Sequence, residues 1–142
     1  MSQNPFIHIR SPKLRVLPGE DDELVNEGMY GKALAEYLQS RLAHRGYQTP
    51  LVVCEDWGWW LTIAGLPFTC GLCIYGSRID DSDDLDLCVT ISTAKGRKWS
   101  WGRFRFIETT AEVERLHQAV RSVLTDDSDI AILGETPDFP LA

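Results

Sequence analysis

Residues 51–91 read LVVCEDWGWWLTIAGLPFTCGLCIYGSRIDDSDDLDLCVTI, and this stretch contains the clearest strand pattern of the chain. Short apolar or alternating runs are separated by turn residues at Gly58, 65–67 and 76–77, a pattern typical of β-strands. Because the connections are too short for parallel crossovers, the stretch predicts an antiparallel meander. The predicted strands are 51–54, 59–64, 68–75 and 85–91.

Further strands are predicted on both sides of this stretch. The short β-like runs 6–9 and 14–17, with Ser-Pro-Lys between them, predict an N-terminal hairpin. The run 103–107 predicts another strand of the meander, and 130–133 predicts a last one. The residues from about 134 onward indicate a loose C-terminal tail.

Two helices complete the pattern. Apolar residues recur every three or four positions from Tyr30 to Leu42, and Gly46 ends this helix. Thr109 and Glu112 form a capping box ahead of a second helix. The apolar stripe of that helix contains Val113, Leu116, Val120, Val123 and Leu124.

The fold class follows from these elements. Two helices with one apolar stripe each can cover only one face of a sheet. The sequence therefore predicts an α+β fold in which two helices pack on one face of an antiparallel sheet of about five to seven strands. The other face is predicted to be open, or covered by something else.

Length and composition predict a single soluble domain over residues 1–142. Hydrophobic residues make up 44% of the chain and charged residues 25%, which is close to the globular average. The start of the chain lacks the features of a secretory signal, and no apolar run approaches the roughly 18 residues of a membrane span. Four cysteines are too few for a disulfide scaffold, so we expect reduced thiols and a cytoplasmic protein. A net charge of −7 argues against a general DNA binder.

No metal or cofactor site is predicted. Cys70 and Cys73 have the spacing of a zinc or redox pair, but they lie within one strand and so point to opposite faces. The acidic run 80–86 resembles a calcium loop, yet counted from Asp81 it lacks the central glycine and the closing glutamate. The three histidines are isolated, and no catalytic motif is present. These absences favour a protein that is not an enzyme.

The segment 95–106, KGRKWSWGRFRF, is the one basic stretch. If Phe104 and Phe106 face the core, alternation places the intervening side chains on the open face of the sheet. Such a face suits the stacking of single-stranded bases or a protein interface, including a homodimer; cross-strand pairs that stabilise a solvated sheet are the alternative. The residues predicted on this face are Trp60, Tyr75, Trp99, Trp101, Arg103 and Arg105.

A second candidate site is the segment Glu55-Asp56-Trp57-Gly58-Trp59. Two carboxylates beside a Trp-Gly-Trp turn predict a lip that holds Arg or Lys by charge and by an aromatic face. The alternative is a hairpin whose tryptophans fill the edge of the core.

Three segments carry a resemblance to a known family. A helix ending in Arg45-Gly46-Tyr47, the E-D-W-G-W segment at 55–59 and the T-x-x-E-V-E-R-L helix at 109–116 resemble a family of small bacterial proteins of uncharacterised function. The resemblance covers about residues 30–133. Some relatives occur in gene neighbourhoods that suggest immunity to toxins, and the resemblance implies no catalytic residues.

The function predicted from the sequence is therefore a non-enzymatic, immunity-like binding module that occludes a basic protein partner such as a toxin. Complementary charge would speed the encounter, and a buried aromatic anchor would hold the complex. One alternative is single-stranded nucleic-acid binding through the open Trp and Arg face. Another is an enzyme with a dispersed acidic site that includes Glu55 and Asp56.

Overall fold

The computed structural model describes residues 4–93 and 103–141, with the backbone alone for 103–109. Two α-helices, α1 (Lys32–His44) and α2 (Arg103–Thr125), accompany a short 3-10 helix, η1 (Glu20–Glu23). The strands are β1 (Phe6–Arg10), β2 (Val52–Cys54), β3 (Trp59–Thr62), β4 (Gly71–Arg78), β5 (Leu85–Ser92) and β6 (Ala131–Thr136).

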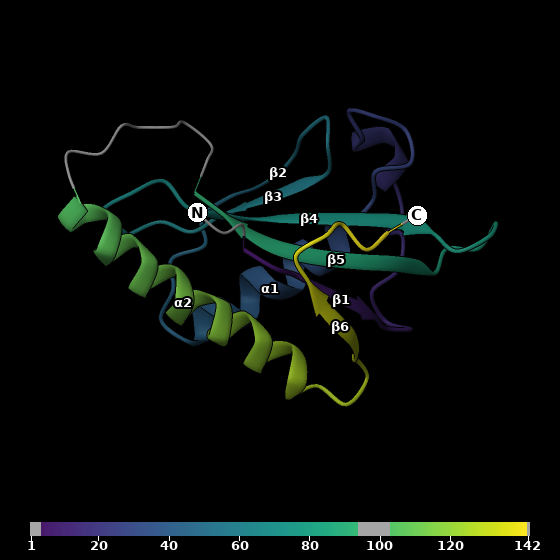
Figure 1. The fold of residues 1–142 in the computed structure, drawn as a ribbon. Coiled ribbons are helices and arrows are strands. Elements are labelled where there is room, and N and C mark those ends of the chain that lie inside the picture. The colour runs from purple at the N-terminus through teal and green to yellow at the C-terminus, as the bar shows by residue number, and fades with distance from the viewer. Residues whose placement is uncertain (1–3, 94–102, 142) are drawn as a thin grey trace.

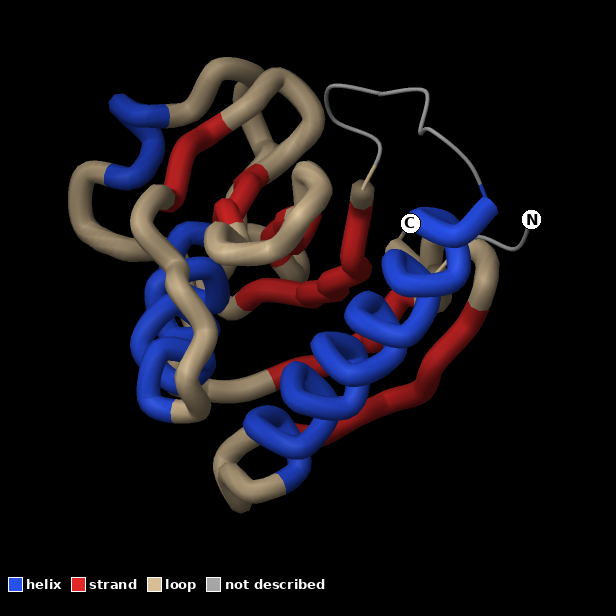
Figure 2. The backbone as a smooth tube through the Cα atoms, turned by 90° about the vertical axis from the view of Figure 1, so that its left-hand side faces the viewer, coloured by secondary structure: helices blue, strands red, loops and turns tan. Residues whose placement is uncertain are grey.

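The strands form one antiparallel sheet in the order β2-β3-β4-β5-β1-β6 (Figure 1). Both helices lie beside the strands (Figure 2) and contribute to a single hydrophobic core with one face of the sheet. Leu34 and Leu38 of α1 and Leu116 and Val120 of α2 are buried in that core. The predicted α+β fold is confirmed.

Alternation along the strands assigns each residue to a face of the sheet. Trp59 pairs with Ile74 and Leu61 with Leu72, and all four side chains are buried in the core shared with the helices. The intervening residues of β3 and β4 therefore point to the opposite face. The expected parity of these two strands is confirmed.

The predicted N-terminal hairpin is wrong. β1 does not pair with 14–17, which form no strand; it lies between β5 and β6 and pairs with both. The 14–17 segment instead crosses the end of the sheet, where the Val16 amide donates to the Asp83 carbonyl over 3.0 Å. β1 suits a position between two strands because Phe6 on one face and Ile7 and Ile9 on the other are all buried.

The predicted strand at 103–107 is also wrong, because these residues form the first turns of α2. The helix begins at Arg103, so Thr109 and Glu112 lie inside it and the expected capping box does not cap it. No Gly or Pro occurs within α2, whereas Gly102 directly precedes it. Because no helix-breaking residue lies within α2, the helix continues back to Arg103. The run 103–107 is too short for its apolar pattern to distinguish a strand, which has a period of two, from a helix, which has a period of about 3.6.

The C-terminal segment is more ordered than the prediction of a loose tail from about 134. β6 extends to Thr136, and Glu135 within it accepts hydrogen bonds from His117, over 3.1 Å, and from Arg121. Burial alone would raise the pKa of Glu135, but these two bonds hold that pKa below its usual value. His117 is thus a satisfied histidine at the boundary of the core, as its place on the helical stripe indicated.

The predicted divergence of Cys70 and Cys73 is confirmed. Cys70 lies in the core shared with the helices, Cys73 points to the other face, and all four cysteines are free thiols. Burial raises the pKa of Cys70 and of Cys88 to about 12, so neither thiol ionises near neutral pH. Across the described residues, no three His, Cys, Asp or Glu side chains gather as a metal site would require.

No helix within the described ranges is both long enough and apolar enough to cross a membrane.

Asp127 joins three distant segments and predicts a loss of stability in acid. It accepts hydrogen bonds from Tyr37, over 2.6 Å, from Lys13 and from the Asp129 amide, and these bonds hold its pKa well below the usual range. A carboxylate with a lowered folded pKa stabilises the protein above its unfolded pKa of about 4 and loses that contribution as pH falls. In urea denaturation, Asp127→Asn is expected to be less stable than wild type at neutral pH, with the difference shrinking below pH 4.

Asp129→Asn is the matched control, since Asp129 is exposed and lies 3.8 Å from the same lysine. This variant should follow the wild-type dependence of stability on pH. An Asp127→Asn curve that stays parallel to wild type from pH 7 to pH 2 would contradict the assignment.

Candidate partner-binding site

A buried carboxylate fixes the acidic helix η1 against the start of α1. Glu20 has no exposed surface. Its Oε1 accepts from the Leu17 amide, and its Oε2 accepts from the Gly31 and Lys32 amides, each over 3.0 Å. Gly31, the N-cap of α1, has no side chain to do this, so Glu20 caps the helix from a distance. The next three side chains, Asp21, Asp22 and Glu23, are left exposed.

A second acidic segment is the turn between β4 and β5. Asp80, Asp81, Asp83 and Asp84 are exposed, while the Ser82 hydroxyl donates to the Ile79 carbonyl over 2.8 Å and holds the turn. Asp80 has a φ of 56°, a left-handed conformation that aspartate tolerates better than most residues. This is the solvated acidic turn expected for the run that resembles a calcium loop.

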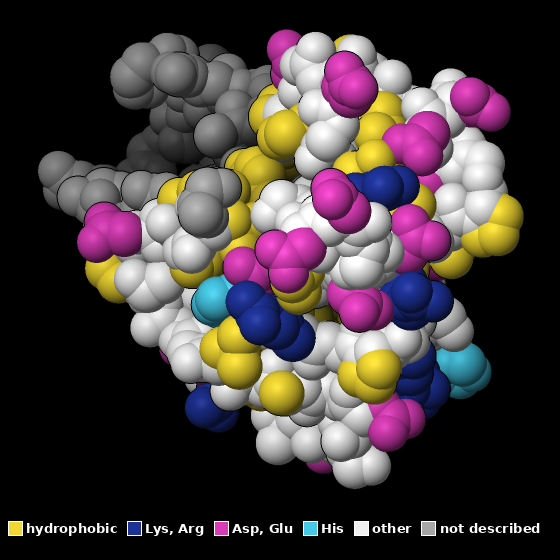
Figure 3. All heavy atoms as spheres, turned by 90° about the vertical axis from the view of Figure 1, so that its right-hand side faces the viewer, with side chains coloured by type: hydrophobic (Ala, Val, Ile, Leu, Met, Phe, Trp, Pro, Cys, Tyr) yellow, Lys and Arg dark blue, Asp and Glu magenta, His cyan; other side chains and the backbone are white. Residues whose placement is uncertain are grey.

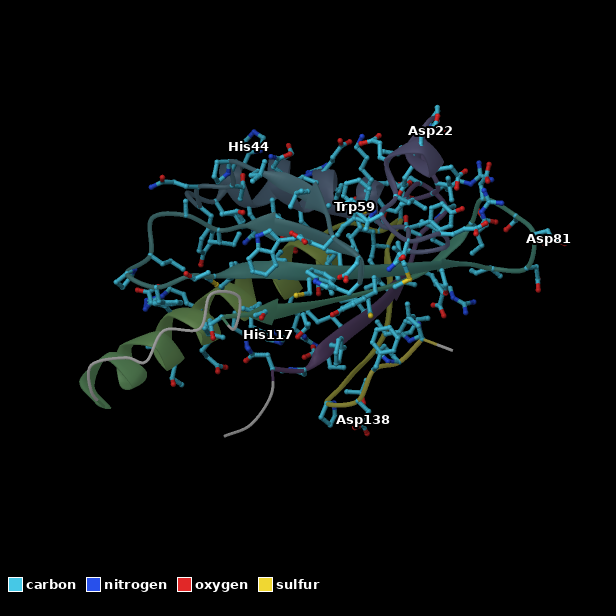
Figure 4. All side chains as sticks on the ribbon, turned by 90° about the horizontal axis from the view of Figure 1, so that it is seen from above. Asp22, His44, Trp59, Asp81, His117 and Asp138 are labelled. Carbon is cyan, nitrogen blue, oxygen red and sulfur yellow. The ribbon has the colours of Figure 1, made fainter. Side chains whose placement is uncertain are left out.

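The two acidic segments lie at the same end of the molecule. Arg78 Nη2 is 3.7 Å from Asp21 Oδ2 and 3.3 Å from Asp83 Oδ1, so one arginine links them. In Figure 4, Asp22 and Asp81 lie towards one end and His44 towards the other. We call this surface the acidic end; its members are Asp21, Asp22, Glu23, Asp80, Asp81, Asp83 and Asp84.

Figure 3 looks onto this part of the molecule and shows acidic side chains spread over it, with a few Lys and Arg side chains between them. Arg15 pairs with Asp84 over 2.9 Å and Lys32 with Glu23 over 2.6 Å. These exposed pairs contribute little to stability. The carboxylates outnumber the cations that pair with them, so the acidic end keeps a negative field.

The E-D-W-G-W turn joins β2 to β3 beside the acidic end. The Glu55 amide donates to the Gly58 carbonyl over 2.7 Å, and the Asn26 side chain donates to the Asp56 carbonyl over 2.6 Å. Asn26 lies between η1 and α1, so this bond connects the turn to the acidic segment. Glu55 is half-buried and Asp56 is exposed. The predicted cation-binding lip therefore continues the acidic end.

Trp57 lies at the tip of this turn and begins a cluster of rings on the sheet face away from the core. Its ring centroid is 5.6 Å from that of Tyr75 and 6.4 Å from that of Trp60. We call this cluster the aromatic patch; its members are Phe6, Trp57, Trp60, Tyr75 and Phe139.

Trp60 is not available to a partner, which corrects its expected place on an open face. Its side chain is 4% exposed, and its Nε1 donates to the Thr62 hydroxyl over 3.0 Å. The ring packs directly on Gly71, where an added Cβ would lie 2.3 Å from it. Trp57 is half-buried and is the tryptophan of the turn that can reach a bound partner.

The basic part of the predicted face is not built as expected. Arg103 and Arg105 belong to α2, so strand alternation does not place them beside Trp60 and Tyr75. Trp99 and Trp101 lie outside the described residues. Of the predicted partner-binding residues, the structure brings together Glu55, Asp56, Trp57, Trp60 and Tyr75.

Comparison with known proteins identifies no relative. No protein-family model, curated protein or solved structure matches the chain. The resemblance to small bacterial immunity-like proteins therefore stays a prediction.

Two contributors to the site were missed from the sequence. The sequence held a signal for Glu20 as a capping residue, because this acidic residue precedes a helix whose own N-cap is a glycine. The signal at Phe139 was weaker. Phe139 is a lone aromatic residue in a segment rich in Pro and acidic residues, and it belongs to no periodic pattern that would place it. Phe139 contacts Tyr75 with ring centroids 5.0 Å apart.

Proposed function

We propose that this chain is a non-enzymatic binding module that captures a basic protein partner through the acidic end and the adjoining E-D-W-G-W turn. One observation carries the proposal: acidic segments from three separate parts of the sequence converge on one end, joined by Arg78 and Asn26. A surface of one sign attracts a partner of the opposite sign and speeds the encounter.

The proposed mechanism is occlusion, as in an immunity protein that covers the working surface of a toxin. The acidic end would steer the partner, and Trp57 would anchor it, because a half-buried tryptophan buries large apolar area on binding and its face attracts Arg and Lys. Phosphate would be repelled by the same field, so a nucleic-acid partner fits this surface poorly.

The experiment reverses the charge of the lip. Glu55→Lys with Asp56→Lys is expected to slow association with a fluorescent Lys/Arg-rich peptide about tenfold at low salt, as measured by stopped-flow mixing. The effect should shrink at physiological ionic strength, where the Debye length falls to about 8 Å. Folding should survive because Asp56 is exposed and Glu55 is half-buried.

Glu114→Lys with Asp126→Lys is the matched control. These two residues are exposed on or just after α2 and change the net charge by the same amount. The control should leave the association rate close to wild type. Equal slowing by both double variants would mean that only net charge matters and would overturn the assignment to this surface.

A further inference from the structure

The aromatic patch contains a seat that the chain fills with its own tail. Phe139 meets Tyr75 and Phe6 edge-on, with ring centroids 5.0 and 5.6 Å apart and interplanar angles of 83° and 84°. Phe6 and Tyr75 also contact each other, and Trp57 contacts Tyr75 from the other side. The seat is thus formed by Phe6, Trp57 and Tyr75, which come from β1, the β2–β3 turn and β4.

Phe139 is held less firmly than the three rings that form the seat, because it is more exposed than any of them. Its side chain is 49% exposed, whereas Phe6 is 6% exposed. Residues 137–141 form neither strand nor helix, and the Asp138 amide donates to the Thr136 hydroxyl over 3.1 Å close to where the tail leaves β6. Phe139 is held by edge-to-face contacts while half of its surface stays exposed, so a competing aromatic ring can displace it.

The residues around the seat indicate what kind of aromatic side chain would compete with Phe139. Trp57 directly follows Asp56, whose carboxylate is exposed, and the turn that carries both is tied to the acidic end by Asn26. An apolar, aromatic seat beside a negative surface is complementary to an aromatic side chain flanked by Lys or Arg.

We propose that the seat formed by Phe6, Trp57 and Tyr75 binds an aromatic side chain of the basic partner, and that Phe139 is the occupant which this side chain displaces. The inference rests on the proposed function for the identity of the partner. The tail keeps the seat covered in the free protein and lowers the affinity for any partner that must displace it.

The first experiment tests the seat without any basic partner. The full-length Phe139→Ala variant is mixed with a synthetic peptide of residues 134–142, GETPDFPLA, or with the same peptide carrying Ala in place of Phe. We expect tryptophan fluorescence to change on addition of the Phe peptide and not of the Ala peptide, because Trp57 borders the seat.

The second experiment uses the full chain and two basic probes, the peptides KKFKK and KKAKK. Wild type should bind KKFKK more tightly than KKAKK. If Phe139 occupies the seat about nine-tenths of the time, Phe139→Ala should strengthen KKFKK binding about tenfold and leave KKAKK unchanged. Leu133→Ala is the matched control, since Leu133 is 50% exposed on the neighbouring strand and should alter neither affinity.

The outcomes separate this inference from the proposed function. Equal binding of KKFKK and KKAKK by wild type and by Phe139→Ala would overturn the aromatic seat and leave capture by charge standing. Failure of both basic peptides, together with Phe-dependent capture of the tail peptide, would support the seat and overturn the basic partner. Dimers formed by Phe139→Ala would overturn the proposal by showing that a second copy covers the rings.

Discussion

Replacing Glu20 by alanine lowers the free energy of unfolding by about 3 kcal/mol, the largest expected effect of any change to an acidic residue in this chain. The Glu20 carboxylate is fully buried and accepts from three backbone amides, those of Leu17, Gly31 and Lys32. Hydrogen bonds to a charged group contribute about 1.5 to 3 kcal/mol, and buried amides left without an acceptor add a further penalty. Urea denaturation measures the loss.

Two variants test whether the loss of stability comes from the missing helix cap or from the removal of any acidic side chain. Asp22→Ala removes an exposed carboxylate from the same short helix and should change stability by less than about 0.5 kcal/mol. Glu20→Gln keeps the shape and one acceptor oxygen and should fall between alanine and wild type. A Glu20→Ala variant as stable as Asp22→Ala would show that water replaces the cap without cost.

The second large effect is expected at Gly58. An alanine Cβ there would lie 2.5 Å from the Ile74 carbonyl oxygen and 3.3 Å from the Tyr75 ring. Since the first of these is backbone in the interior of the sheet, the clash is relieved only by moving the turn away from β4. We expect Gly58→Ala to cost about 3 kcal/mol in urea denaturation and to weaken binding of the Lys/Arg-rich peptide, because Asp56 and Trp57 move with the turn.

Gly134→Ala provides the comparison for this prediction. Gly134 lies in strand β6, and an added Cβ there meets nothing within 4 Å. It should therefore leave stability within about 0.5 kcal/mol of wild type. Equal effects of the two substitutions would mean that the turn does not press on β4 as described.

The middle of the fold was predictable because its signal is local. Residues 51–91 alternate with period two between glycine-rich turns, and the strands at Val52, Trp59, Gly71 and Leu85 all appeared in the expected order. Their ends shifted, since β4 begins at Gly71 rather than at 68. The turn predicted at 76–77 is wrong, because Gly76 and Ser77 lie within β4 and pair with Leu87 and Asp86.

The errors arose where distant contacts decide the structure. No local pattern distinguishes a strand at 14–17 from a loop, and β1 finds its partners only when β5 and β6 are both present. The five residues 103–107 fit the apolar pattern of a strand as well as that of a helix. They are helical because they are continuous with the rest of α2.

The candidate site was half predictable for the same reason. The E-D-W-G-W segment could be selected from composition, and strand parity placed Trp60 and Tyr75 on one face of the sheet, but the contact of Trp57 with Tyr75 was not predicted. The convergence of the Glu20–Glu23 helix with the 80–84 turn depends on Arg78 and on the path of the chain after Leu17, which no periodicity reports.

The position of β1 between β5 and β6 sets the order in which the chain can fold. Hairpins among β2 to β5 join neighbours in sequence and form early, whereas the pairing of Phe6 with Thr136 closes a loop through nearly the whole chain. During synthesis, β1 can dock on β5 as soon as β5 emerges, but its other edge stays unpaired until β6 has left the ribosome. A nascent chain stalled before Ala131 therefore presents one unpaired edge of β1, and chaperones that shield unpaired strands are expected to bind that edge until β6 emerges.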